Sequence, residues 1–160
     1  MEMQTKELLL RTPLHQMGLT EGDHFPVGGF GAVLARAGVG KTAFLVQLAI
    51  DYMLRGSNVL HISLDDPVRK VALWYREVYQ NLAGGREEER LERLWETMQP
   101  RRFIMTFKVE GFSVPKLEER LTDLMEQDIF RPQMMLVDGL PFDDSAHSQL
   151  TELKALAQKY

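Results

Sequence analysis

Hydrophobic residues in this chain gather in short continuous runs, and the longer stretches between those runs carry apolar residues at helical spacing. The short runs predict strands at residues 32–35, 58–64, 102–109 and 134–138. The run at 58–64 is almost continuously apolar, which is typical of a parallel strand covered on both faces. The run at 32–35 is expected to be a short buried strand.

Amphipathic stretches predict the helices, and glycine, proline and serine mark their ends. The expected helices span residues 41–55, 67–82, 86–98, 114–127 and the stretch from 145 to the C-terminus. Gly56 and the Gly84-Gly85 pair end two of these helices, and Ser113 caps another. The helix at 86–98 is expected to bury one apolar stripe, formed by Leu91, Leu94, Trp95 and Met98.

Strands and helices alternate along the chain, which predicts a mainly parallel sheet with flanking helices and right-handed connections. A length of 160 residues favours a single domain. We expect residues 1–30 to form an arm and loop, and residues 31–160 to form a three-layer α/β core. Within the arm, residues 2–10 are expected to be a short helix or docking segment, and the Gly- and Pro-rich residues 11–30 to be loop and turns.

Candidate chemistry begins directly after the first expected strand, in a glycine-bearing loop that leads into a helix. The loop ends in Gly40-Lys41-Thr42, as phosphate-binding loops do, although Ala35 stands where the first glycine of that motif belongs. Alanine fits this position if its φ is negative. The alternative interpretation is an ordinary glycine-rich turn between a strand and a helix.

The chemistry of such a loop follows from its backbone. Successive N–H groups and the helix N-terminus attract phosphate oxygens, the Lys41 ammonium reaches the terminal phosphates, and the Thr42 hydroxyl can ligate Mg²⁺. The expected nucleotide contacts are Ala35, Arg36, Ala37, Gly38, Val39, Gly40, Lys41, Thr42 and Ala43.

Acidic residues follow the expected strands at the edge where parallel sheets bind ligands. Asp138 ends a hydrophobic run and is the expected second anchor for Mg²⁺, unless it merely caps a turn. Asp65 and Asp66 end the neighbouring strand, and either carboxylate can place a water molecule in line with the terminal phosphate. We favour Asp65, because Asp66 precedes Pro67 and can cap the next helix.

Several further polar and aromatic residues receive structural interpretations. His61 lies in mid-strand and is expected to be a hydrogen-bonded core histidine rather than a catalytic one. Trp74 and Tyr75 are expected to pack in the core or an interface rather than stack on adenine. Asp143 and Asp144 are expected to belong to the loop that leads into the last helix.

Composition narrows the classes of function. The chain has no cysteine, which excludes a disulfide framework and thiolate metal sites and agrees with a cytoplasmic location. Its net charge of −4 provides no overall field that would attract DNA or RNA. The polar N-terminus is not followed by a signal-length apolar region, and no apolar stretch approaches the ~20 residues that a membrane-spanning helix needs.

The loop at 35–44 closely resembles the phosphate loop of replicative-helicase ATPase domains in the RecA-like superfamily, where loops also often begin with Ala-Arg. The run that ends in Ser-Leu-Asp at residue 65 is similar to the next strand of that family, which ends in Ser-Leu-Glu. The run ending at Asp138 is similar to its metal-binding strand, and circadian-clock and recombinase ATPases share this layout. The resemblance covers roughly residues 18–140.

This resemblance implies a RecA-like fold that binds ATP and Mg²⁺ and assembles into rings or filaments, with the sites near subunit interfaces. In that family the Glu activates water, so the resemblance assigns this role to Asp65, whose side chain is one methylene shorter. Gly139 follows Asp138, where other ATPases carry a catalytic Glu. The family's core continues with a strand between the metal-binding and phosphate-loop strands, so we expect this core to be incomplete after the metal-binding strand.

A second resemblance is to the deviant phosphate loop of partitioning and cell-division-positioning ATPases, which reads Lys-Gly-Gly-x-Gly-Lys-Thr. Residues 36–42 match its end, but Arg36 replaces the signature Lys, and Ser63 stands where the first Asp of their Asp-x-Asp-Pro belongs. This resemblance therefore ranks second.

The sequence predicts an ATP-binding protein that hydrolyses ATP with Mg²⁺, coupled to self-association or to a protein partner. An alternative from another class is a nucleotide-gated interaction module that binds ATP but turns over little. A small-molecule kinase would need an acceptor pocket and an Arg-bearing lid, and the sequence identifies neither.

Overall fold

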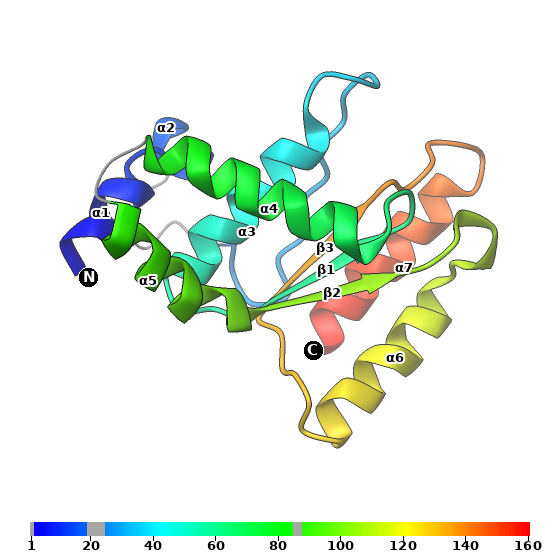
Figure 1. Ribbon diagram of the computed structural model, residues 1–160. Helices are drawn as coiled ribbons and strands as arrows, with labels where there is room; N and C mark the ends of the chain where they lie inside the picture. Colours follow the sequence, from blue (N-terminus) through cyan, green and yellow to red (C-terminus); the bar gives the residue numbers. More distant parts are fainter. Residues whose placement is uncertain (1, 19–24, 85–87) are drawn as a thin grey trace.

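The computed structural model describes residues 2–18, 25–84 and 88–160 (Figure 1). The helices are α1 Glu2–Leu9, α2 Pro13–Gln16, α3 Lys41–Leu54, α4 Val68–Ala83, α5 Glu88–Met98, α6 Val114–Glu126 and α7 Ala146–Lys159. The strands are β1 Val59–Ser63, β2 Arg102–Thr106 and β3 Met134–Asp138, and short 3₁₀ turns lie at Gln99–Arg101 and Val109–Gly111.

The strands form one parallel sheet in the order β2-β1-β3, which confirms the predicted parallel α/β architecture. β1 is the central strand, where Val59 pairs with Arg102 on one side and with Met134 on the other. At the other end of the strand, Ser63 pairs with Asp138. The C-terminal ends of the strands therefore meet at one edge of the sheet.

Helices cover both faces of this sheet (Figure 1). Side chains alternate between the faces along β1, so Val59 enters the core beneath α3, α4 and α5, whereas Leu60 and Ile62 enter the core beneath α6 and α7. In the described part of the chain, no helix combines the length and the apolar character that crossing a bilayer requires.

Local signals set the helix boundaries as predicted. Gly84 ends α4 in the left-handed conformation (φ 66°), and the Ser113 side chain caps α6 by accepting a hydrogen bond from the N–H of Lys116. Gly85 and the first residues of the helix expected at 86–98 lie outside the described residues. The expected apolar stripe of α5 packs into the core that it shares with α3 and α4; its residues are Leu91, Leu94, Trp95 and Met98.

The predicted strand at 32–35 is wrong. The structure assigns no strand there, and residues 31–40 are all exposed. A strand needs hydrogen bonds from a neighbour, and in the described residues β3 pairs with β1 on one side and with no strand on the other. A short run without a partner therefore remains irregular, however apolar its residues are.

Two smaller differences concern the segments around the core. The short helix α2 lies in the stretch expected to be loop, of which residues 19–24 fall outside the described part. β2 ends at Thr106 instead of continuing to residue 109, where a 3₁₀ turn begins.

The N-terminal segment is fastened to the far end of α3 by a buried polar cluster. Asp51 of α3 is fully buried, and its carboxylate accepts a hydrogen bond from the Thr12 hydroxyl. The same carboxylate forms an ion pair with Arg55, with 2.5 Å between Nε and Oδ1. Helix α3 thus begins at the glycine-bearing loop and ends at the contact that holds the N-terminal segment.

Candidate functional site

The glycine-bearing loop adopts backbone conformations that explain its glycines. Gly38 and Gly40 have φ values of 79° and 91°, and apart from the adjacent residues no atom of the described chain lies within 4 Å of a Cβ built on either one. Glycine is therefore required there by conformation rather than by lack of space. Among the described non-glycine residues, positive φ occurs only at Asp128, so Ala35 meets the condition under which alanine can replace glycine.

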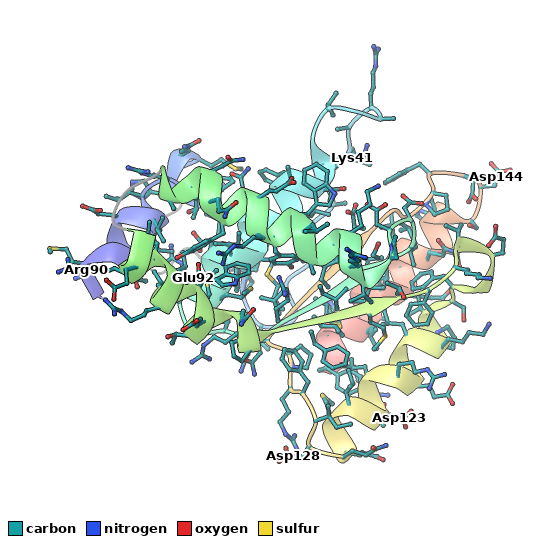
Figure 2. All side chains as sticks on the ribbon, viewed as in Figure 1. Lys41, Arg90, Glu92, Asp123, Asp128 and Asp144 are labelled. Atoms are coloured by element: carbon teal, nitrogen blue, oxygen red, sulfur yellow. The ribbon has the colours of Figure 1, made fainter. Side chains whose placement is uncertain are left out.

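The Lys41 side chain folds back over its own loop. Its Nζ donates hydrogen bonds to the carbonyl oxygens of Ala35, at 2.8 Å, and of Arg36, at 2.9 Å. Figure 2 shows Lys41 at the base of the loop, which projects from the body of the molecule. The ammonium group therefore lies against the loop and links its first two residues to the start of α3.

Thr42 and Asp138 meet where the first turn of α3 approaches the end of β3. The Thr42 hydroxyl donates a hydrogen bond to Asp138, with 2.7 Å between Oγ1 and Oδ2. A hydroxyl and a carboxylate oxygen are hard ligands of the kind that Mg²⁺ prefers, so this pair fits the expected metal. No group of three or more His, Asp or Glu side chains suited to a metal ion occurs in the described ranges.

The two carboxylates that follow β1 have different surroundings in the structure. Asp66 forms an ion pair with Lys70 in the first turn of α4, with 2.7 Å between Oδ1 and Nζ. The expected cap is not made, because the residue before α4 is Pro67 and no side chain caps the helix. Asp65 is exposed at the same edge, and its carboxylate lies against the backbone of Gly139.

Asp143 and Asp144 lie in the loop before α7, as expected, and Figure 2 shows Asp144 at the outer end of that loop. The Asp143 carboxylate accepts hydrogen bonds from the Ser145 N–H, at 2.8 Å, and from its hydroxyl, at 2.6 Å. Asp143 therefore shapes the turn that starts the helix.

A buried histidine stands on β1, two residues before Ser63. His61 Nδ1 lies 3.0 Å from the hydroxyl of Tyr75, and the Arg102 guanidinium lies 4.5 Å from the centre of the Tyr75 ring. Burial lowers the pKa of His61 to about 4; the negative charge of Asp138 opposes this shift and Arg102 adds to it. The core location of His61 is confirmed, but full hydrogen bonding is not, because Nε2 has no partner in the described residues.

Sequence reasoning missed Gly139 as a residue of the site. Its φ is 85°, and a Cβ on this residue would collide with the Asp65 carboxylate. A glycine directly after a strand-terminal Asp could have indicated a position with a special backbone conformation. The contact with Asp65 could not be predicted, because it depends on the pairing of β1 with β3.

Comparison with protein families gives a match over most of the chain. The model of a family described as AAA domain matches residues 4–150. No curated protein and no solved structure matches the chain. The matched span includes the loop at 35–43 together with Asp65 and Asp138.

Proposed function

The chain belongs to the AAA-domain family, a family of P-loop nucleotide-binding proteins of ATPase type, and on this premise we propose that it binds Mg·ATP at residues 35–43 and hydrolyses it. In the proposed reaction a water oxygen attacks the γ-phosphorus, the bond to the β–γ bridging oxygen breaks, and ADP and phosphate leave. The proton of the attacking water passes to Asp65 or to solvent.

The hydrogen bond between Thr42 and Asp138 is the observation that carries this proposal. It joins the residue after the loop lysine to the carboxylate at the end of β3, at the sheet edge where parallel α/β proteins bind ligands. When Mg²⁺ binds, the Thr42 hydroxyl and the Asp138 carboxylate would be the residues that hold it, and the ion would neutralise charge on the phosphates.

Lys41 supplies the positive charge for the phosphates. Its ammonium group already stands at the loop, bonded to carbonyl oxygens that a triphosphate oxygen can replace as hydrogen-bond acceptor. Stabilising the charge that develops on the transferred phosphoryl group is the main way in which such sites accelerate hydrolysis.

Within the family we propose the RecA-like type, related to the ATPase domains of replicative helicases and clock proteins. The support is the order of the motifs, with Ser63-Leu64-Asp65 at the C-terminal end of β1, the strand directly beside the one that ends at Asp138. The partitioning type has less support, because Arg36 stands in place of its signature lysine.

A second candidate is a nucleotide-gated interaction module. The exposed apolar side chains beside the loop favour it, because a bound partner or a second copy of the chain would cover them; they are Val33, Leu34 and Val39. Such a module would bind Mg·ATP and release little phosphate.

Calorimetric titration with Mg·ATP tests the binding site. The wild-type protein is expected to bind, and Lys41→Ala to lose detectable binding. Lys154→Ala is the matched control, because it removes the same charge from the exposed face of α7. Equal affinity of Lys41→Ala and the wild type would refute the site. If the site is confirmed, a phosphate-release assay on the wild type separates the two candidates, because the ATPase releases phosphate and the interaction module releases little.

A further inference from the structure

Gly139 and Asp65 are in contact at the edge of the sheet. A Cβ built on Gly139 would lie 2.6 Å from Oδ2 and 2.8 Å from Cγ of Asp65, well inside the distance that real atoms tolerate. The Asp65 carboxylate therefore occupies the space that any other side chain at position 139 would need.

The backbone fixes this contact. The ladder between β1 and β3 continues one step past the strands, because the N–H of Leu64 donates to the carbonyl of Asp138 at 2.9 Å. This step brings residue 65 beside residue 139, where the Asp65 nitrogen would lie 3.2 Å from the added Cβ. The pairing of β1 with β3 holds the backbone at both positions, so a side chain added at residue 139 would have to push the Asp65 side chain aside.

No hydrogen bond or ion pair holds the Asp65 carboxylate within the described residues, whereas its neighbour Asp66 is bound to Lys70. The space beside Gly139 is therefore what allows the carboxylate to stand where the structure places it. Gly139 directly follows Asp138, the residue whose carboxylate accepts the hydrogen bond from Thr42, so Asp65 meets the chain one residue past that carboxylate.

We infer that Gly139 is a positioning residue: because it has no side chain, the Asp65 carboxylate can occupy the space against its backbone, from which it acts on the nucleotide. This inference rests on the proposed function. A methyl group at position 139 would displace the Asp65 carboxylate outward, and a displacement of about 1 Å at a reacting group can reduce turnover about 100-fold.

A double-mutant cycle tests the inference with Gly139→Ala, Asp65→Ala and the double variant, all saturated with Mg·ATP. Gly139→Ala is expected to lower phosphate release about 100-fold and to leave the Mg·ATP dissociation constant nearly unchanged. In the Asp65→Ala background the same substitution is expected to change phosphate release less than about threefold. An equal loss in both backgrounds would overturn the inference, since it would show that Gly139 acts without Asp65.

The matched control is Gly56→Ala. Gly56 has a φ of 90°, similar to that of Gly139, but the nearest atom to its added Cβ is Arg101 Cζ at 3.9 Å. This variant measures the effect of backbone conformation alone and should retain wild-type phosphate release. If Gly139→Ala fails to fold, Gly139→Asn replaces it, because Asn tolerates positive φ and carries the same Cβ.

A second measurement does not depend on turnover. The carboxyl ¹³C resonance of Asp65, assigned by its loss in Asp65→Asn, is expected to shift in Gly139→Ala and to stay in place in Gly56→Ala, while Asp123 on α6 serves as the internal reference. An unmoved Asp65 resonance in Gly139→Ala would overturn the inference. If the wild type binds Mg·ATP but releases no phosphate, the proposed hydrolysis fails, and this resonance still decides whether Gly139 places the carboxylate.

Discussion

The hydroxyl oxygen of Thr42 lies 2.7 Å from a carboxylate oxygen of Asp138, although the two residues are 96 positions apart in the chain. Thr42 belongs to the first turn of α3 and Asp138 is the last residue of β3, so this hydrogen bond connects the glycine-bearing loop to the sheet. A metal ion bound here would find one ligand oxygen from each segment already in place.

We expect the Thr42→Val variant to lose the contribution of Mg²⁺ to ATP binding. Valine keeps the shape of threonine and removes the ligand oxygen. In calorimetric titrations the wild type should bind ATP at least about tenfold more tightly with Mg²⁺ than with a chelator. The variant should show the same affinity in both conditions. A variant that retains the full response to Mg²⁺ would remove Thr42 from the metal site.

The proposed role of Asp65 predicts a separation between binding and turnover. Asp65→Asn keeps the size of the side chain and removes the charge that orients the attacking water. Phosphate release should fall about 100-fold or more, with little change in the Mg·ATP dissociation constant. Asp123→Asn on α6 is the control, because it makes the same change far from the loop (Figure 2). Undiminished turnover in Asp65→Asn would assign the role to another group.

The buried histidine predicts a pH-dependent stability. Unfolding restores the pKa of His61 from about 4 to its ordinary 6.5, so between these values the unfolded state binds a proton that the folded state does not. The free energy of unfolding should therefore be highest above pH 6.5, fall as the pH drops toward 4, and level off below. The full shift corresponds to about 3 kcal/mol.

Urea unfolding between pH 7.5 and pH 4 checks this dependence. His61→Gln should lose most of the slope in this window, whereas His147→Gln, on the exposed side of α7, should keep it. Identical slopes in the His61 variant and the wild type would mean that other groups dominate the acid response.

The buried cluster at the end of α3 predicts a large loss of stability on truncation. Asp51→Ala leaves the Arg55 guanidinium and the Thr12 hydroxyl without their carboxylate, and removing one partner of a buried ion pair lowers the free energy of unfolding by about 3 kcal/mol or more.

The chain contains a matched pair on its surface for comparison. Glu89 and Arg93 are also a carboxylate and an arginine four residues apart, with 2.9 Å between their charged atoms, but their side chains are 85% and 59% exposed. Glu89→Ala should change the free energy of unfolding by less than about 0.5 kcal/mol. Equal effects of the two substitutions in urea unfolding would contradict the structural role of Asp51.

Local patterns were sufficient to predict most of the fold. β3 begins and ends at the predicted residues, and α5 buries its predicted stripe, because periodicity and end signals lie within each segment. The prediction of a strand at 32–35 was wrong because it depended on information outside the segment. A strand exists through its pairing with another segment, and the pattern of one segment contains no information about whether a partner is present.

The same distinction applies to the candidate site. The loop residues and the strand-terminal carboxylates stand out by type and position, and the structure brings Thr42 and Asp138 together. The division between Asp65 and Asp66, and the contact of Asp65 with Gly139, depend on the ladder between β1 and β3 and on Lys70. The sequence was sufficient to identify the candidate residues, but the register between β1 and β3 determines which of them are in contact.

The exposure of residues 31–40 has a thermodynamic consequence. If a triphosphate binds at this loop as proposed, it would order a stretch of chain that is now exposed to water. The loss of conformational entropy would then offset part of the favourable binding enthalpy. Calorimetric titration with Mg·ATP should therefore record a favourable enthalpy and an unfavourable entropy of binding.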